Sequence, residues 1–482
     1  MLEEIIKERK RKVKELRENK LNPYPATVRR NAKIGEVLVG FLKLSSLKKK
    51  VWLTGRVRSL RDQGKIIFFD LEDESGKIQV VLKRDEFKDF RQIKNHLDIG
   101  DFVEVFGFPF KTQRGEKSID VKSARIITKS LRPLPSDFYG LEDTEIRLRK
   151  RYLDLILNKD LRELFIKKTK FWKSVREFMD SDNFMEVETP VLESVPGGAE
   201  AEPFVTHHNA LDEDFYLRIS LEIALKKLIV GGFEKVYEIG RIFRNEGIDA
   251  EHLQDYTQLE FYWAYADYND LKKFLEKMYK FVIKKTFGTL ILNYQGKKIN
   301  WGKKWGTVDY CKEFIKENKL DPKTVSKDDL IKRAKDLKID IPSGSGKGRL
   351  IDLIYKKTVR PKLIQPCFLI NPPVEIEPLA KRYEKDPRVV ERLQIMACGT
   401  ELGKGFSELN DPQDQRERFE EQMKLRAAGD KEAQMLDEEF LEALEYGMPP
   451  TTGFGMSERL FAVLADKPVR EMVFFPPMKK RG

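Results

Sequence analysis

The sequence predicts an α+β protein of two domains, a small β-barrel followed by a larger domain of helices and strands. The chain has 482 residues, which is more than one hydrophobic core usually organises. Short strand-like segments follow one another from residue 51 to about 127. A proline-bearing segment, LRPLPSDFYG, then separates these strands from an amphipathic helical pattern. The two patterns on either side of this segment predict two different domains.

Composition limits the class of protein. Hydrophobic residues make up 40% of the chain and aromatic residues 11%, which is enough for substantial cores. The net charge of +12 favours a polyanionic partner, although a solvated charged surface also accounts for it. The three cysteines form no CxxC pair, so neither a disulfide framework nor a cysteine-rich zinc site is indicated. Without a signal core or a long apolar run, we expect a soluble, cytoplasmic protein with no membrane association.

Residues 1–50 are expected to form a helical extension. Charged residues surround Ile6, Val13 and Leu16 between residues 2 and 20, as in an amphipathic helix. The NPYP motif that begins at Asn22 ends this helix because proline lacks a backbone N–H. Solvation and contact with nucleic acid explain the charge of the helix equally well.

Residues 51–130 are expected to form an OB-fold barrel. The strand-like segments are VWLTGRVRSL, KIIFFDLEDESGKIQVVLKR, DFVEVFGFPF and SIDVKSARII, separated by glycine-containing turns. Strands of such barrels present aromatic and polar groups to unstacked bases. Alternation places Phe68 and Phe69 on opposite faces, so that one packs inside and the other is available outside.

Residues 131–144 are expected to be a linker, and residues 145–482 the second domain. A helix is predicted from about Leu161 to Ser181, followed by a strand in FMEVETPVL that Pro190 should break or confine to an edge. The apolar residues of the helix, which an intrachain core would explain, are Phe165, Trp172, Val175 and Met179.

The segment from Phe243 to Trp263, FRNEGIDAEHLQDYTQLEFYW, predicts a hairpin with one chemical face. Alternation in its second arm places Tyr256, Gln258, Glu260 and Tyr262 on one side and Leu259, Phe261 and Trp263 on the other. Its first arm, from Val236 to Glu246, sends Arg244 and Glu246 to a common side. An ordinary half-buried hairpin explains each arm alone, but the two arms together indicate nucleotide handling.

This hairpin resembles motif 2 of the class II aminoacyl-tRNA synthetases, specifically of the lysyl-tRNA synthetases. The resemblance covers nearly the whole chain, from ELRENKLNPYP through EPFVTHHNALD and LIQPCFLINPPVEIEPLAKR to GKGFSELND, and TTGFGMSERLFAVLADKP resembles motif 3. It implies an N-terminal OB-fold that binds the anticodon and a class II catalytic domain with an antiparallel sheet flanked by helices. It also implies a homodimer formed through motif 1, the predicted helix and FMEVETPVL.

The resemblance implies a lysine-tRNA ligase that uses ATP and Mg²⁺. L-lysine and ATP would give lysyl-adenylate and pyrophosphate, and the lysyl group would pass to the 3′ end of tRNA(Lys). Glu401 would hold Mg²⁺, since hard oxygen donors suit that ion. The residues that match ATP-binding positions are Arg244, Glu246, His252, Tyr256 and Arg459, of which Arg244, Glu246 and Arg459 would be catalytic.

Three carboxylates match positions that bind lysine in the family. Two ammonium groups require more negative charge than a neutral amino acid does. We expect Glu222 and Glu260 near the α-amine. We expect Glu408 and Tyr262 on the ε-ammonium. With 79 acidic residues in the chain, ordinary exposed glutamates are the alternative. The full set of matching positions is Gly198, Glu222, Glu260, Tyr262, Phe406 and Glu408.

Four barrel residues match anticodon-binding positions. Phe68 would stack on a base, Gln79 and Glu116 would hydrogen-bond uracils, and Arg61 occupies a matching basic position. An amide and a carboxylate suit the donor and acceptors on the pairing edge of uracil.

In motif 3, Ser457 is expected to cap the helix that begins near Arg459.

Several departures from the family predict a divergent, bacterial-type branch. Gln394 replaces a usual metal-binding glutamate, Glu251 and Glu202 replace usual arginines, and Lys404 replaces a pocket asparagine. Motif 3 is one residue shorter than the common pattern. Three other functions stay open: an aspartate or asparagine enzyme, a lysine ligase that modifies an elongation factor, and an RNA-binding regulator with an idle ATP site.

Overall fold

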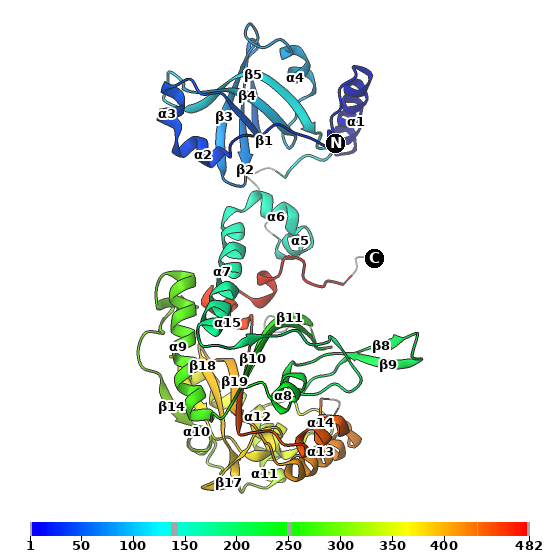
Figure 1. Ribbon diagram of the computed structural model, residues 1–482, viewed down its shortest axis with the longest axis vertical. Helices are drawn as coiled ribbons and strands as arrows, with labels where there is room; N and C mark the ends of the chain where they lie inside the picture. The colour runs from blue at the N-terminus through cyan, green and yellow to red at the C-terminus, as the bar shows by residue number, and fades with distance from the viewer. Residues whose placement is uncertain (1, 136–142, 246, 248–252, 431, 480–482) are drawn as a thin grey trace. The chain divides into compact units, whose positions relative to one another are not determined.

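The computed structural model describes residues 2–135, 143–245, 247, 253–430 and 432–479 (Figure 1). The chain divides into two compact units, Met1–Glu142 and Asp143–Gly482, which we call the first and the second unit. The division lies close to residue 145, where the second domain was expected to begin. Among the described helices, none is long and apolar enough to cross a membrane.

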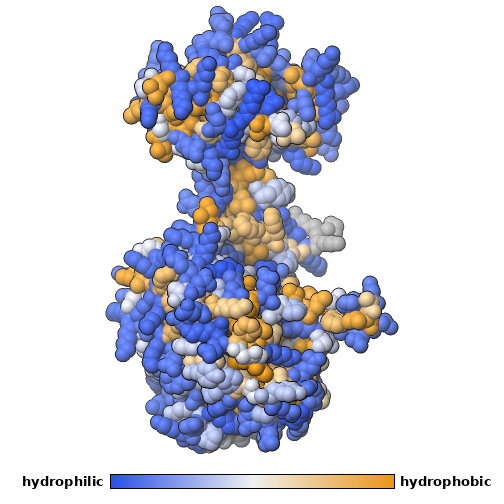
Figure 2. All heavy atoms as spheres, viewed as in Figure 1, coloured by the Kyte–Doolittle hydropathy of each residue, from blue (hydrophilic) through white to orange (hydrophobic). Residues whose placement is uncertain are grey.

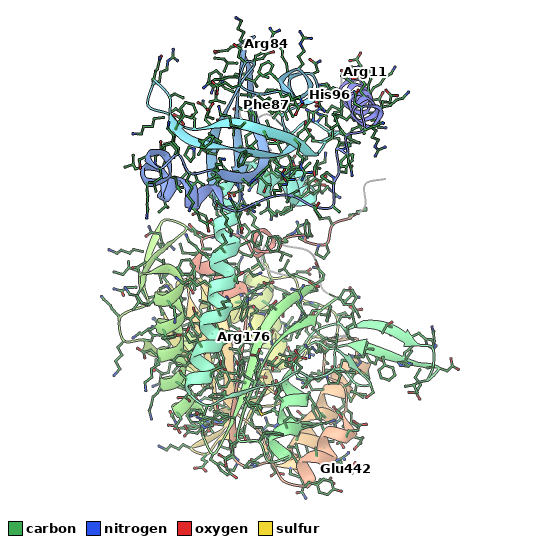
Figure 3. The ribbon with its side chains drawn as sticks, turned by 45° about the horizontal axis from the view of Figure 1, so that its top comes forward. Arg11, Arg84, Phe87, His96, Arg176 and Glu442 are labelled. Carbon is green, nitrogen blue, oxygen red and sulfur yellow. The ribbon has the colours of Figure 1, made fainter. Side chains whose placement is uncertain are left out.

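The first unit contains a closed five-stranded barrel, as the sequence predicted. Its strands are β1 (Val51–Asp62), β2 (Ile66–Asp73), β3 (Gly76–Lys83), β4 (Phe102–Lys111) and β5 (Lys117–Thr128), in the order β1-β2-β3-β5-β4. The pair β3–β5 is parallel and the other pairs are antiparallel. Alternate residues such as Val57, Phe69 and Val105 fill the interior. The short helix α4 (Phe90–His96) adds Phe90, and its His96 is marked in Figure 3.

The N-terminal helices belong to the barrel's own packing unit. They are α1 (Leu2–Glu18), α2 (Ile34–Val39) and α3 (Phe41–Ser46). Leu16, Ile34 and Phe41 join the barrel core, and the buried Arg9 of α1 donates to the carbonyls of Ser130 at 2.8 Å and Ile99 at 3.0 Å. Three helices thus lie between residues 2 and 46, and they pack with the barrel instead of forming a separate body.

The second unit is built on an eight-stranded sheet in the order β14-β15-β18-β19-β20-β11-β10-β6. Neighbours from β15 to β10 are antiparallel, and the outer pairs, β14–β15 and β10–β6, are parallel. The strands are β6 (Met185–Glu186), β10 (Lys235–Phe243), β11 (Asp255–Ala264), β14 (Gly306–Asp309), β15 (Cys367–Ile370), β18 (Arg392–Ala397), β19 (Thr400–Ser407) and β20 (Thr451–Ser457).

Helices cover both faces of this sheet. On one face, α7 (Lys159–Ser181) and α9 (Tyr268–Phe287) pack on Leu259 and Phe261 of β11. On the other, α8 (Glu222–Val230), α13 (Pro412–Ala427) and α14 (Glu438–Glu445) share a core with Tyr262 and Phe406. Residues Trp172, Val175 and Met179 lie in the first of these cores, so packing within the chain accounts for them.

The remaining described helices and strands complete the second unit. Pro190 lies between β6 and β7, as expected of a strand break. Figure 3 marks Arg176 of α7, whose Nε donates to Glu186 of β6 at 2.8 Å. The elements are α5 (Thr144–Arg149), α6 (Arg151–Leu157), β7 (Leu192–Glu193), β8 (Phe204–His208), β9 (Glu213–Leu217), β12 (Ile291–Tyr294), β13 (Lys297–Asn300), α10 (Tyr310–Asn318), α11 (Lys327–Asp336), α12 (Lys347–Thr358), η1 (Arg360–Lys362), η2 (Val374–Ile376), β16 (Arg382–Tyr383), β17 (Asp386–Val390), α15 (Arg459–Leu464) and η3 (Val469–Met472).

Two local expectations are corrected. Strand β10 ends at Phe243, so Arg244 follows the strand instead of belonging to it. The N-cap of α15 is Glu458, not Ser457, because the serine lies at the end of β20, although its hydroxyl still accepts the N–H of Arg459 at 3.3 Å. Glu246, Glu251 and His252 lie outside the described residues.

Candidate active site

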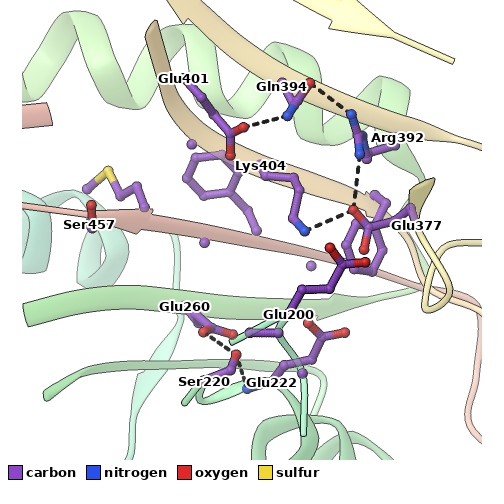
Figure 4. A pocket seen from close by; sticks show the side chains of 18 of the residues that line it. Glu200, Ser220, Glu222, Glu260, Glu377, Arg392, Gln394, Glu401, Lys404 and Ser457 are labelled. Atoms are coloured by element: carbon purple, nitrogen blue, oxygen red, sulfur yellow. Dashed lines mark hydrogen bonds and ion pairs between the residues drawn. The ribbon is translucent and has the colours of Figure 1, made fainter. Parts of the chain in front are cut away.

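A polar cavity of about 280 Å³ lies between α12 and the strands β11, β19 and β20 of the second unit (Figure 4). It brings together most of the residues singled out in the sequence. Those that line it are Gly198, Glu222, Arg244, Tyr256, Glu260, Tyr262, Glu401, Phe406 and Arg459. Glu408 does not line the cavity; it is 1% exposed and lies behind the wall formed by Tyr262 and Gly453.

Strand β11 provides one polar wall, because its alternation is the predicted one. Tyr256, Gln258, Glu260 and Tyr262 line the cavity, whereas Leu259 and its alternates enter the core behind the sheet. The Oε1 atom of Glu260 accepts from Ser220 Oγ at 2.7 Å, from the Leu221 N–H at 3.0 Å and from Gln258 Nε2 at 2.5 Å. Tyr262 donates to Oε2 at 3.2 Å. Four donors thus fix this buried carboxylate before any ligand arrives.

A buried lysine that the sequence analysis did not identify joins two of the predicted carboxylates. Lys226 has no exposed side-chain surface; its Nζ lies 2.5 Å from Glu222 Oε1 and also forms an ion pair with Glu408 Oε2. Glu222 and Lys226 are four residues apart in α8, which places them on one side of the helix. That spacing, in SLEIALKKL, was the available signal.

We call this group, with Glu260, the carboxylate end of the cavity. Three carboxylates and one ammonium make up this end, so two negative charges are in excess when all four groups are ionised. Burial raises the pKa of Glu222 to about 7 and that of Glu408 well above its usual value, and the pull of Lys226 only partly offsets this. Although burial opposes its charge, Glu222 and Glu408 raise the pKa of Lys226 to about 12. Among the described residues, Glu408 Oε1 has no hydrogen-bond partner.

Two glycines let the backbone form the wall at this end. A Cβ atom at Gly453 would overlap Glu408 Oε1 and the Tyr262 ring. Gly198 has a φ of +80°, and a Cβ there would lie 2.8 Å from the Cβ of Glu222. Side chains at these positions would close the carboxylate end.

Two arginines, Arg244 and Arg459, also line the cavity. The Arg244 Nε donates to the carbonyl of Ile219 at 3.2 Å, and its Cζ lies 5.8 Å from the Tyr256 ring centroid. Arg459 is the first residue of α15, as expected, and Leu460 and Leu464 anchor that helix in the core. Both arginines face a cavity large enough for a bound anion, which would offset the unfavourable helix dipole at Arg459.

A chain of polar groups, which we call the network end, completes the cavity. Lys404 Nζ lies 2.9 Å from Glu377 Oε2, and Arg392 lies 3.3 Å from the same atom. Arg392 also donates to Gln394 Oε1 at 2.8 Å, and Gln394 Nε2 donates to Glu401 Oε2 at 2.5 Å (Figure 4). Burial of Glu377 is outweighed by Lys404 and Arg392, which hold its pKa below the usual value. The charge of Lys404 is thus already paired.

The predicted base-reading residues lie on the outer surface of the barrel. Phe69 is 1% exposed and packs inside, while Phe68 is half-buried and faces outward, so core packing does not account for Phe68. Arg61 pairs with Phe68 across β1 and β2 and is exposed. Gln79 lies on the neighbouring strand β3, and its Oε1 atom accepts from the Ser118 hydroxyl at 2.9 Å. The exposed Glu116 lies in the β4–β5 turn.

Comparison with known proteins agrees with both units. Residues 143–479 match the family model described as tRNA synthetases class II (D, K and N), and residues 51–127 match an OB-fold nucleic acid binding domain. The chain belongs to the class II tRNA synthetases. It is 44% identical to the lysine–tRNA ligase of Carboxydothermus hydrogenoformans, over 100% of this chain and 99% of that protein. It is 44% identical to that of Thermotoga maritima (100% and 97% covered) and 45% to that of Moorella thermoacetica (90% and 89% covered).

In this class II tRNA synthetase, two of the residues that were expected to depart from the family pattern belong to the network end. Gln394 and Lys404 are both members of it. Their partners, Arg392 and Glu377, were missed in the sequence, although Arg392 stands two residues before Gln394 and therefore on the same face of β18. Glu202 lies outside this network, and its carbonyl accepts the N–H of Asn245 at 2.8 Å.

Proposed function

We propose that this class II synthetase is a lysine–tRNA ligase. The observation that carries the proposal is the charge of the carboxylate end, where Glu222, Glu260 and Glu408 exceed Lys226 by two negative charges. L-lysine brings two ammonium groups, so it would balance this excess, with Glu260 beside the α-amine and the buried Glu408, whose Oε1 has no hydrogen-bond partner among the described residues, on the side of the ε-ammonium. The relatives of the same length bear that name.

The proposed reaction has two steps and needs no protein nucleophile. A carboxylate oxygen of lysine attacks the α-phosphorus of ATP, and pyrophosphate leaves. The 3′-terminal hydroxyl of tRNA then attacks the lysyl carbonyl, and AMP leaves. Arg244 would bridge the lysine carboxylate and the α-phosphate, where a planar guanidinium can bind two oxygens at once. Adenine would stack between Tyr256 and Arg459, with Glu246 and His252 orienting the nucleotide.

One Mg²⁺ fits the donors at the network end. Glu401 presents a carboxylate to the cavity, and only its Oε2 is taken by Gln394. Magnesium is commonly held by one or two carboxylates together with substrate phosphates, so the remaining Glu401 oxygen suffices for one ion. When bound, the ion would neutralise phosphate charge, while Arg244 and Arg459 position the nucleotide.

The barrel would read the anticodon of tRNA(Lys). Phe68 offers an outward ring for stacking, and Gln79 and Glu116 offer an amide and a carboxylate for uracil edges. Arg61 adds a cation for the backbone. This assignment favours a tRNA ligase over a ligase that modifies a protein, because the latter has no use for such a surface.

Exposed apolar residues near motif 1 support a homodimer. Tyr152 of α6, Ile166 of α7 and Met185 of β6 have more than half of their surface exposed, at 55%, 64% and 51%. Figure 2 shows hydrophobic residues on the surface over α6 and the start of α7. Large exposed apolar groups on neighbouring elements are typical of subunit interfaces. We therefore infer that a second copy covers this region.

The direct test is ATP–pyrophosphate exchange with each amino acid in turn. We expect exchange with L-lysine and none with neutral or acidic amino acids, because only an amino acid with two positive charges balances the carboxylate end. Exchange driven by aspartate or asparagine would contradict the lysine assignment. An absence of exchange with every amino acid would favour an RNA-binding protein with an idle ATP site.

A further inference from the structure

Both ends of the Gln394 side-chain amide are hydrogen-bonded within the network end. An arginine can only donate and an ionised glutamate can only accept, so its two partners, Arg392 and Glu401, fix the orientation of the amide. The amide nitrogen carries no lone pair for a metal ion, and the oxygen lies 2.8 Å from the Arg392 guanidinium, whose positive charge would repel one. A group of three or more His, Cys, Asp or Glu side chains that could hold a metal is likewise absent from the described residues. The donor set therefore fits one ion at Glu401 and does not fit a second.

The Gln394 amide gives Glu401 a hydrogen-bond donor where a glutamate would need a bridging cation. Its Nε2 lies 2.5 Å from Glu401 Oε2, so a glutamate at position 394 would set two carboxylates against each other. Two such carboxylates require a proton or a cation between them. With glutamine instead of glutamate at position 394, a ligand for a second metal ion is missing. The negative charge that this second ion would neutralise is missing as well.

Helix α12 brings protein cations to the same cavity. Gly348, Arg349, Asp352 and Lys356 line it and recur at near-helical spacing, while Leu350, Ile351 and Ile354 face the core on the other side. Gly348 holds the helix against η2, because a Cβ there would overlap the Glu375 carbonyl.

Lys356 is the cation best placed to meet a ligand. Its side chain is 51% exposed although it lines the cavity, and Asp352, one turn earlier, holds its Nζ at 2.7 Å. Asp352 raises the pKa of Lys356, although burial opposes the shift. Lys356 and Glu401 line the same cavity. Arg349 is instead engaged by Glu432.

We propose that Lys356 binds the polyphosphate of ATP beside Glu401 and supplies, as a fixed protein charge, the neutralisation that a second divalent ion would give. The inference rests on the proposed function, since it takes ATP as the ligand. A lysine ammonium carries three donors on a flexible stem and suits phosphate oxygens. This ATP site would then depend on magnesium less than one built from two metal-binding carboxylates.

The first test measures binding of a non-hydrolysable ATP analogue to the full-length protein by calorimetry, with L-lysine present, in EDTA and in MgCl₂. We expect wild type to bind in both buffers. Lys356→Met should weaken binding about 10-fold or more in EDTA and less in MgCl₂, because a charged hydrogen bond to phosphate is lost. Lys357→Met is the matched control: its lysine is the exposed neighbour on α12 that does not line the cavity.

Equal affinities for the Lys356→Met and Lys357→Met proteins would overturn the inference while leaving the proposed function intact. Failure of wild type to bind the analogue in either buffer, together with no exchange in the amino-acid panel, would instead remove the proposed function and the inference with it.

The second test counts ions and does not depend on Lys356. Manganese bound in the presence of the same analogue is counted by electron paramagnetic resonance. Wild type should hold one ion per site, and Gln394→Glu should hold two, because the variant restores the facing carboxylate. Two ions in wild type would contradict the inference. A thermal unfolding scan of Gln394→Glu verifies that the variant is folded before its ions are counted.

Discussion

The cavity of the second unit and the outer face of the barrel use the same kinds of side chain in opposite settings. Each has an arginine, a carboxylate, an amide and an aromatic ring. In the cavity the carboxylates Glu222 and Glu260 are buried and already have partners, Lys226 and Ser220. On the barrel, Arg61 and Glu116 are exposed. A charge held out of water is worth far more than one in water, so equal substitutions should have unequal effects.

The largest effect is expected at Arg244. Replacement by alanine should lower kcat/KM for adenylate formation by roughly 10³-fold or more, because charge that develops on the α-phosphate loses a bidentate partner. Arg61→Ala on the barrel is the matched control and should leave adenylate formation within about twofold. Pyrophosphate exchange kinetics give both values. Wild-type exchange by Arg244→Ala would remove the arginine from the reaction.

Glu408→Gln should come next. The change leaves Lys226 with one buried counter-charge and the ε-ammonium with none, a loss of about 2–5 kcal/mol in buried pairs, or about 30-fold or more in lysine affinity. The KM for ATP should change little. Glu116→Gln makes the same chemical change on the exposed turn and should leave lysine activation alone. If the lysine KM of Glu408→Gln equals that of wild type, Glu408 has no part in the pocket.

Barrel substitutions should separate the two activities. Phe68→Ala and Gln79→Ala should each weaken charging of a UUU-anticodon tRNA by roughly 10- to 100-fold, since stacking and polar contacts are each worth about 1–3 kcal/mol. Adenylate formation should stay within about twofold. Phe106→Ala, another half-buried ring on β4, which does not pair with β2, controls for barrel stability. Parallel loss of both activities would indicate misfolding instead of lost recognition.

The smallest expected effect is the change of lysine affinity with pH. In the free protein the pKa of Glu222 is raised to about 7, and lysine requires the ionised form. Lysine affinity should therefore be higher at pH 8 than at pH 6 and fall by up to about tenfold per unit below pH 7, with a proton released on binding. Calorimetry in two buffers of different ionisation enthalpy measures that proton. Equal lysine affinity at pH 6 and pH 8 would argue against a protonated Glu222.

Sequence patterns predicted the fold well because periodicity records burial. The barrel strands, α7 and the two faces of β11 all follow from alternation or helical spacing. Residues such as Glu260 and Gly198 could be placed in the site because motifs fix them locally. The charge partners were harder to find: helical spacing could have linked Lys226 to Glu222, but only tertiary packing brings Lys226 to Glu408 and Lys356 to the cavity.

The most direct measurement is aminoacylation by wild-type protein of two tRNA transcripts that differ only in the anticodon. The account predicts that lysine becomes esterified to the 3′ end of the transcript with UUU. A changed anticodon should lower kcat/KM by roughly 100-fold or more, because several barrel contacts are lost together. Equal charging of the two transcripts would contradict anticodon reading by the barrel, and no lysyl-tRNA from either would contradict the ligase itself.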